Sequence, residues 1–202
     1  MIEPLAPPNS SWPNVVLING LAFHLIAKNA TLSIRDALLR SMGIEKQNIQ
    51  DFDGLECVYK TQSRGYKIGF IRNPIDRAVS TWRNKLHAEG VVEKPPLLLQ
   101  YGFEMGCSFD DYIRDLRRWR FLDKHTAPQI RYIRRPEEMD YLGRMEDLPM
   151  HWKMLQLKYR WLPDLKRLNA TAPMELSQSH RAALMEMYEE DYVLWQSLAL
   201  AK

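Results

Sequence analysis

The segment after an early apolar run combines a lysine with two hydroxyl residues. Lys28 follows the run at 21–27, and Thr31 and Ser33 stand where apolar residues begin to recur at helical spacing. Backbone N–H groups at a helix start lack partners within the helix and carry partial positive charge, so they bind phosphate well. Together with an ammonium group and two hydroxyl donors, they predict a site for the 5′-phosphate end of a nucleotide. A capped helix beside a solvated lysine is the alternative.

The order of residues in this segment separates it from the P-loops that hydrolyse ATP or GTP. The pattern GxxxxGK[ST] is absent, because Lys28 precedes the turn and does not open the helix. Ser33 is followed three residues later by Asp36, which is a capping-box pattern, so we expect the helix to begin near Ser33. Gly43 is a suitable residue to end it.

A second junction of the same kind lies further along the chain. Residues 66–71, YKIGFI, have the composition of a buried strand, and Arg72 and Asn73 follow it. A helix is expected from about Pro74 to Leu86, since proline suits the first helical turn, where its missing N–H costs nothing. One face of this helix holds Ile75, Val79, Trp82 and Leu86, and the other holds Arg77, Ser80 and Asn84.

The two junctions resemble the two cofactor motifs of sulfotransferases that use 3′-phosphoadenosine 5′-phosphosulfate (PAPS). Residues 72–83 match R-[DN]-P-x-x-R-x-x-S-x-x-R, that family's 3′-phosphate-binding motif, at every fixed position. Residues 27–33, AKNATLS, resemble its 5′-phosphosulfate loop, P-K-x-[AG]-x-[TS]-[ST]. Both stand at strand-to-helix junctions in the family's order. The resemblance is to the carbohydrate-type sulfotransferases (sulfotransferase family 2), which include the chondroitin and dermatan enzymes.

Less specific matches extend the resemblance along most of the chain. Residues 123–129 are similar to the family's D-x-H-[WT]-x-P-Q segment, 141–148 to its [YF]-[VI]-G-[RK]-x-E-x-L segment, and 187–192 to its C-terminal Y-x-x-D-[FY] helix. Two positions depart from the family's loop. Ala27 replaces the usual proline, and Leu32 stands where a hydroxyl residue is common, which removes one phosphate donor.

The resemblance implies roles for the matching residues. Lys28 would contact the phosphosulfate and stabilise charge on the bridging oxygen as the S–O bond breaks. Arg72 and Ser80 would hold the 3′-phosphate, where the planar fork of arginine can bind two oxygens at once. Arg77 and Arg83 have a second interpretation, a salt bridge on the helix surface. The expected cofactor-binding residues are Lys28, Asn29, Ala30, Thr31, Leu32, Ser33, Arg72, Arg77, Ser80 and Arg83.

Sulfuryl transfer needs an aligned acceptor oxygen, a neutralised leaving group and a general base. No metal is required where lysine and arginine supply the positive field. His125 is the first candidate for the base, because imidazole exchanges protons near neutrality and the matching family segment contains a histidine. A structural or substrate-orienting role is its alternative. Glu146 is the second candidate, with an ion pair to Arg144 as its alternative, and His24 is expected to be buried in a strand.

The resemblance implies that PAPS is the sulfuryl donor, that its product is adenosine 3′,5′-bisphosphate (PAP), and that the acceptor is a carbohydrate hydroxyl. Trp82, Trp119, Trp152 and Trp161 either stack on sugar rings or fill the core. Two other functions stay open. One is a nucleotide-binding protein without transferase activity. The other is a small phosphoryl-transfer enzyme, which the missing Walker lysine and the lack of a clear Mg²⁺-binding acidic pair disfavour.

The elements that must position these residues alternate along the chain. Strand–helix, strand–helix, then mixed elements predict an α/β, P-loop-like three-layer fold with a central mostly parallel sheet flanked by helices. The 202 residues suit an extended lead-in at 1–14 and a single domain at 15–202. Strands are expected at 21–27, 56–60, 66–71, 130–133 and 141–145, and helices at 33–42, 74–86, 109–118, 150–162 and 178–198.

Composition excludes several other classes. With 28 basic and 25 acidic side chains, the formal charge of +3 is too small to indicate nucleic-acid binding. No apolar run approaches the roughly 20 residues of a membrane span, and the Pro-rich start does not resemble a signal peptide. Two cysteines outside any metal-ligand pattern suit a reduced compartment. We therefore expect a cytoplasmic protein, with a Golgi-lumen catalytic fragment lacking its anchor as the alternative.

Overall fold

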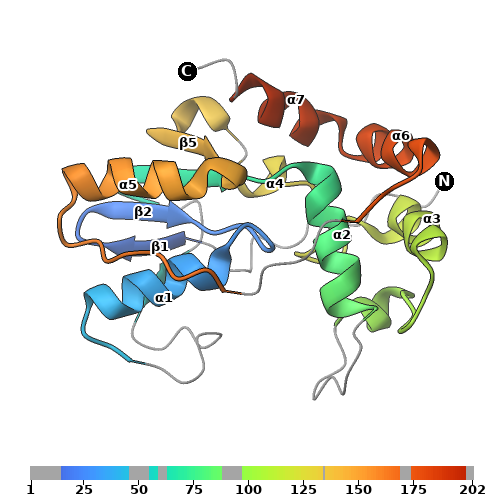
Figure 1. Ribbon diagram of the computed structural model, residues 1–202, viewed down its shortest axis with the longest axis horizontal. Coiled ribbons are helices and arrows are strands. Elements are labelled where there is room, and N and C mark those ends of the chain that lie inside the picture. Colours follow the sequence, from blue (N-terminus) through green and yellow to red (C-terminus); the bar gives the residue numbers. More distant parts are fainter. Residues whose placement is uncertain are drawn as a thin grey trace.

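The computed structural model describes residues 15–45, 55–58, 63–87, 97–133, 135–168 and 174–198, so the lead-in expected at 1–14 lies outside the described residues. The strands are Val15–Ile18 (β1), Leu21–His24 (β2), Glu56–Val58 (β3), Tyr66–Ile71 (β4) and Tyr141–Arg144 (β5) (Figure 1). The α-helices are Thr31–Ser41 (α1), Pro74–Lys85 (α2), Phe109–Trp119 (α3), Ile130–Ile133 (α4), Leu148–Lys158 (α5), Gln178–Met187 (α6) and Glu189–Ser197 (α7). Short 3₁₀ helices lie at Leu97–Tyr101 (η2), Pro136–Glu138 (η3) and Met145–Asp147 (η4).

In the described part of the chain, five strands form one mixed sheet in the order β3-β1-β2-β4-β5. β2, β4 and β5 run parallel, with His24 opposite Gly69 and Ile71 opposite Arg144, whereas β1 pairs antiparallel with β2 and β3. The carboxyl ends of parallel strands meet at one edge of a sheet, where open α/β folds bind their ligands. The segments that follow β2, β4 and β5 therefore meet at that edge.

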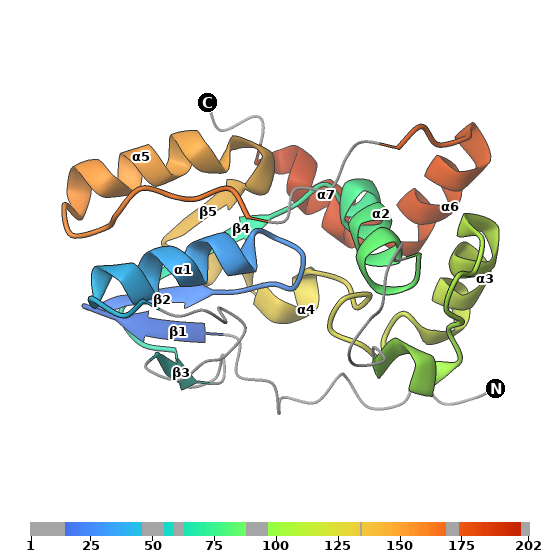
Figure 2. The same cartoon turned by 60° about the horizontal axis from the view of Figure 1, so that its bottom comes forward.

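Helices cover both faces of the sheet, which confirms the predicted three-layer α/β fold. Phe23 of β2, Leu38 of α1 and Trp152 of α5 belong to one buried cluster, so α1 and α5 share a face. On the other face, Ile71 of β4 packs with Ile133 of α4, and α7 covers this second cluster. Figure 2 shows α1 and α5 together on one side of the strands and α4 on the other.

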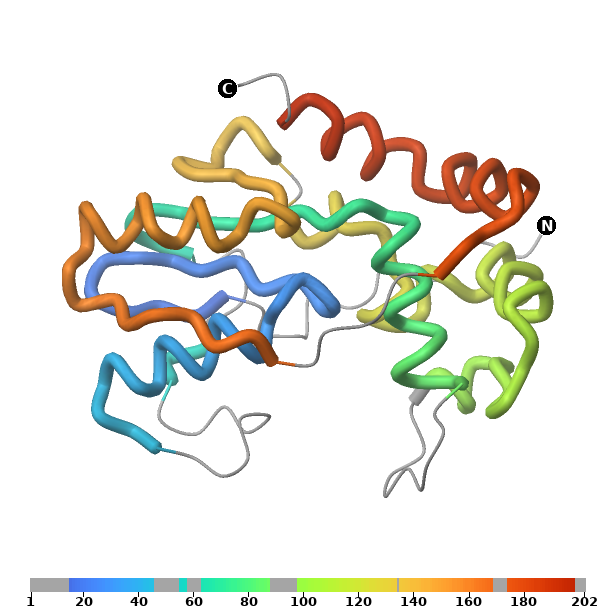
Figure 3. The backbone as a smooth tube through the Cα atoms, viewed as in Figure 1, coloured from blue at the N-terminus to red at the C-terminus, as the bar shows by residue number. Residues whose placement is uncertain are grey.

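A third cluster joins α2, α3 and α6 beyond the edge of the sheet. Trp82 of α2, Tyr112 of α3 and Leu184 of α6 are all buried in it. Figure 3 shows these helices grouped at the end of the molecule away from the β1–β2 hairpin. As a result α2 is enclosed on both sides: Arg77, Ser80 and Thr81 are buried as well as the expected apolar face.

Three elements differ from the sequence prediction. β1 was not expected, and Asn19 and Gly20 connect it to β2 in a tight turn with φ of 46° and 77°, as a two-residue hairpin requires. The strand expected at 130–133 is the helix α4, because the carboxylate of Asp191 accepts hydrogen bonds from the N–H groups at its start. The single helix expected at 178–198 is divided at Tyr188 into α6 and α7.

Candidate functional site

The loop between β2 and α1 curls its backbone around the start of the helix. Lys28 and Ala30 both have left-handed backbone conformations, with φ of 72° and 54°. The first hydrogen bond of the helix runs from Ile34 N–H to the Ala30 carbonyl at 3.0 Å. The N–H groups of residues 31–33 therefore have no acceptor within the helix. Successive N–H groups in such a loop form a concave site for an anion.

The capping box predicted at Ser33 is wrong. The helix begins at Thr31, after Ala30, and Ser33 is buried in its first turn. The Ser33 hydroxyl accepts a hydrogen bond from Leu168 N–H at 3.2 Å, while the Thr31 hydroxyl donates to the Ile26 carbonyl at 2.8 Å. Of the two predicted phosphate-binding hydroxyls, that of Thr31 donates within the protein and that of Ser33 accepts, so the Ser33 O–H and the backbone N–H groups are the donors that this loop can offer.

Lys28 lies among cations. Burial, followed in order by the neighbouring charges of Lys85, Arg72 and Arg77, lowers the pKa of Lys28 to about 7. Among the described residues, no carboxylate is a cause of this shift. A partly buried ammonium group surrounded by positive charge is unfavourable in isolation, and a bound anion would remove the conflict.

Arg72 connects the second junction to the first. It follows β4, and its guanidinium donates a hydrogen bond to the backbone carbonyl of Lys28 at 3.0 Å. Burial lowers the pKa of Arg72, while Asp76 and Glu146 oppose the shift and Arg77 adds to it. The structure thereby brings together the two predicted anion sites, because parallel β2 and β4 end side by side.

A buried amide holds the two junctions in register. The side-chain oxygen of Gln129 accepts hydrogen bonds from the Asn29 amide at 2.6 Å and from Arg72 N–H at 3.0 Å. Its amide nitrogen donates to the Arg72 carbonyl at 2.8 Å. Asp191 in turn accepts from the backbone N–H groups of Gln129 and Ile130. Asn29, predicted as a cofactor residue, is 2% exposed and serves this network.

Arg77 is buried and clamps two loops. Its guanidinium donates to the carbonyls of Ala27 at 3.0 Å, Ala127 at 2.9 Å and Lys124 at 3.1 Å. The predicted surface salt bridge is therefore wrong, and the three carbonyls occupy donors that the phosphate role assigned to Arg77 would need. The residue joins the Lys28 loop to the segment that contains His125, which is a positioning role.

The other residues predicted to bind phosphate lie on α2 and at the start of α1. Ser80 is buried two turns into α2, and its carbonyl accepts a hydrogen bond from the Asn84 side chain at 2.8 Å. Arg83 is half-buried one turn further. Ala30 is the residue that precedes α1, and Leu32 lies in its first turn.

His125 is oriented by a carboxylate. Its Nδ1 atom lies 2.7 Å from an oxygen of Asp123, and the same oxygen accepts from the His125 backbone N–H at 2.7 Å. Asp123 is 1% exposed. Burial lowers the pKa of His125, Asp123 opposes this, and the charges of Lys85 and Lys124 lower it further. With Nδ1 donating to Asp123, Nε2 of a neutral ring is left as the proton acceptor.

The contacts of Glu146 differ from those that its predicted role as a general base requires. One carboxylate oxygen accepts from Asn73 N–H at 2.7 Å and the other from the Trp195 indole at 3.0 Å. Arg144 stacks on the same Trp195 ring at 3.8 Å and donates to its carbonyl at 2.8 Å. Glu146 and Arg144 therefore both contact Trp195, and the hydrogen bonds of Glu146 connect α7 to the second junction.

Lys85 is a residue that the sequence analysis missed. It ends α2, is half-buried, and its charge influences both Lys28 and His125. A usable signal was present in the sequence, because Arg77, Thr81 and Lys85 follow each other at steps of four on one side of a helix.

The tryptophans mostly fill the core. Trp82 and Trp152 are 7% and 2% exposed, and Trp152 packs against Phe23. Trp119 and Trp161 are half-buried beside the same clusters. The core interpretation therefore holds for the first two, and His24 is buried as expected.

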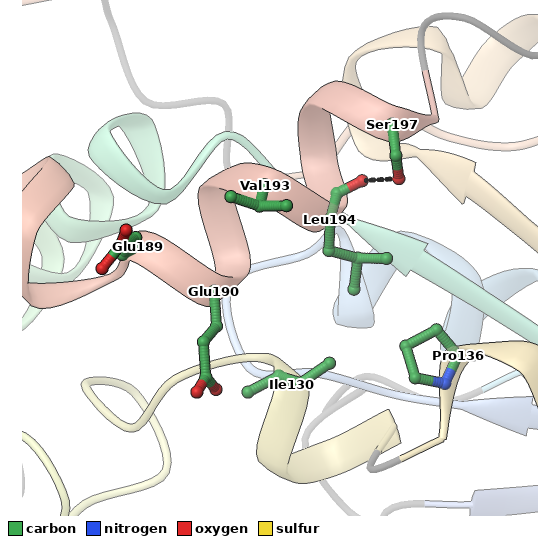
Figure 4. A pocket seen from close by; sticks show the side chains of 7 residues that line it. All are labelled: Ile130, Pro136, Glu189, Glu190, Val193, Leu194 and Ser197. Atoms are coloured by element: carbon green, nitrogen blue, oxygen red, sulfur yellow. Dashed lines mark hydrogen bonds between the residues drawn. The ribbon is translucent and has the colours of Figure 1, made fainter.

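Outside the two junctions, the described residues offer few features that could form a site. They contain no group of three or more acidic, histidine or cysteine side chains placed to hold a metal ion. None of their helices is long and apolar enough to span a membrane. A hollow of about 490 Å³ lies against α7, lined in part by Ile130, Pro136 and Leu194 (Figure 4). None of its lining residues belongs to either junction.

The fold and the two junctions define an α/β protein with a cation-rich site at the carboxyl edge of its parallel strands. The chain belongs to the sulfotransferase family, whose model matches residues 15–196. It is therefore a transferase of the sulfuryl-transferring class. Searches of curated proteins and of solved structures found no match.

Proposed function

We propose that the protein transfers the sulfuryl group of PAPS to a carbohydrate hydroxyl. The observation that carries this proposal is the contact between Arg72 and the Lys28 carbonyl, because two junctions this close support the binding of both to one doubly phosphorylated adenosine. Family membership supports sulfuryl transfer in general, and PAPS as donor follows from the match of both junctions to the family's motifs.

The residues present fit a nucleotide with phosphate groups at both ends. The first junction offers unpaired N–H groups and Lys28, and the second offers Arg72 and the start of α2. The charges that shift the pKa of Lys28 are all positive. Such a cluster is suited to a ligand that brings several negative charges.

PAPS supplies the activated S–O bond, and the protein supplies charge and alignment. Lys28 stabilises the negative charge that develops on the bridging oxygen, in a site where the interaction is little screened by water. Nε2 of His125 accepts the hydroxyl proton of the acceptor, while Asp123 holds the ring in place. Arg77 keeps the Lys28 loop and the His125 segment at a fixed separation.

Calorimetry with PAP and AMP tests the nucleotide site. The extra 3′-phosphate should make PAP bind about tenfold or more tightly than AMP, because charge-assisted hydrogen bonds to Arg72 are added. Arg72→Gln should remove most of that difference, and the exposed Arg118→Gln on α3 should not. Equal affinity for PAP and AMP in the unaltered protein would contradict the proposal.

Transfer itself is tested with PAPS carrying a radioactive sulfur and a set of neutral and acidic oligosaccharides. Label on a saccharide hydroxyl is the expected result. Tight PAP binding together with no transfer to any acceptor would instead indicate a nucleotide-binding protein without transferase activity.

A further inference from the structure

One side of α2 forms a row that faces the site. Arg77, Thr81 and Lys85 lie one turn apart. Arg77 donates to carbonyls on both loops, and the Thr81 hydroxyl donates to the His125 carbonyl at 3.0 Å. The row therefore lies beside both the Lys28 loop and the His125 segment, and Lys85 is its last member.

Lys85 is the last residue of this row and of α2. None of the ion pairs among the described residues includes it. It is half-buried, and it is near enough to Lys28 and to His125 to disfavour a positive charge on each. A cation held beside a second cation, with no ion-pair partner in the described part of the chain, is placed to meet an anion.

The geometry of the proposed reaction indicates which anion Lys85 would bind. In the proposed function, Lys28 serves the leaving oxygen and His125 serves the attacking one. In an in-line displacement the sulfur lies between these two oxygens, and its three other oxygens lie around that line. A group that neighbours both Lys28 and His125 is therefore beside the sulfur.

We propose that Lys85 binds the non-bridging oxygens of the sulfuryl group during transfer, an inference that rests on the proposed function. In this step a bond forms between the acceptor oxygen and sulfur, and the bond between sulfur and the bridging oxygen breaks. The bonding electrons go to the leaving 5′-phosphate, and the hydroxyl proton goes to His125. Lys85 keeps its protons and holds the sulfuryl oxygens throughout.

The test compares ligands with and without the sulfuryl group. PAP lacks it, so Lys85→Gln should change PAP affinity by no more than about threefold at pH 6, where Lys28 is charged in either protein. The single-turnover rate of transfer from PAPS should fall by about 10²-fold, as expected for loss of one charged donor to a transition state. Lys85→Arg should recover part of that rate, and the exposed Lys153→Gln on α5 is the matched control.

A second measurement separates this role from a structural one. Removing the charge of Lys85 should raise the pKa of Lys28, so the loss of PAP binding at alkaline pH should begin at a higher pH in Lys85→Gln. A variant that transfers at the unaltered rate overturns the inference. So does a variant that loses PAP and PAPS affinity equally, because Lys85 would then contact the nucleotide.

The unaltered protein is measured in the same series. If it binds no PAP and transfers no label, the proposed function is overturned and this inference with it. If it transfers and Lys85→Gln transfers equally well, only the inference about Lys85 is lost.

Discussion

The guanidinium of Arg72 donates a hydrogen bond to the backbone carbonyl of Lys28, with 3.0 Å between the two atoms. The two residues are 44 positions apart in the chain and end neighbouring parallel strands. One contact thus joins the two segments that the motifs assign to opposite ends of the same nucleotide. If Lys28 and Arg72 had faced different sides of the molecule, one nucleotide could not have reached both.

The pH dependence of PAP binding should follow Lys28. Its pKa is lowered to about 7, so the free protein carries the ammonium charge below that pH and loses it above. PAP affinity should therefore be highest near pH 6 and fall as pH rises from 7 to 9, by at most about tenfold per pH unit. Calorimetry in buffers of equal ionic strength measures this. Affinity that rises over the same range would contradict the assignment.

Lys28→Met should stabilise the free protein while abolishing transfer. Because the folded-state pKa of about 7 lies below the ordinary lysine pKa of 10.5, the cost of burying the charge is fully present below pH 7. It declines between pH 7 and 10.5. After allowance for solvent screening, we expect a gain of about 1 kcal/mol in the free energy of unfolding at pH 6, shrinking towards pH 10. Urea denaturation at both pH values tests the sign.

Arg77→Lys should be costly although it keeps the charge. A lysine cannot reach the carbonyls of Ala27, Lys124 and Ala127 together, so buried acceptors lose their partners. We expect the free energy of unfolding to fall by about 2–4 kcal/mol. Arg118→Lys, an exposed change on α3, is the control and should alter it by less than about 0.5 kcal/mol. Equal stability of the two variants would show that the clamp contributes nothing.

His125→Ala should leave PAP binding nearly intact and slow transfer by about 10²–10⁴-fold. Burial lowers the pKa of His125 from 6.5, so the base is neutral at pH 7 and the fall in rate that its protonation causes should lie on the acidic side of the profile. Asp123→Asn removes the charge that supports the imidazolium, so this acid limb should move to still lower pH. An unchanged pH–rate profile in His125→Ala would show that His125 is not the general base and that another residue accepts the proton.

Several parts of the site were predictable from local sequence because local physics decides them. Each of these features can be recognised from a few neighbouring residues: the helix start at Pro74, the apolar strand before Arg72 and the lysine before a helix start. The match of residues 72–83 to a phosphate motif is equally local. The α/β class followed from the alternation of elements, and the family model covers the same chain from residue 15 to 196.

The incorrect predictions involve residues whose role depends on distant partners. Ile130–Ile133 has the composition of a strand, but Asp191 caps it as a helix from 61 residues away. Ser33 and Asp36 have the spacing of a capping box, but the Ser33 hydroxyl accepts a hydrogen bond from the backbone N–H of Leu168. Arg77 falls on the polar side of an amphipathic pattern, but helices on both sides bury it.

The sequence by itself determined which ionisable residues are present and that a helix starts at Pro74, because both depend on residue type and on neighbours in the chain. Only the tertiary structure decided which charges meet. Lys28, Arg72, Lys85 and His125 come from four separate segments, and the parallel pairing of β2 with β4 and the packing of α2 against both loops bring them together. Coulomb interactions depend on distance in space, and distance in the chain gives no measure of it.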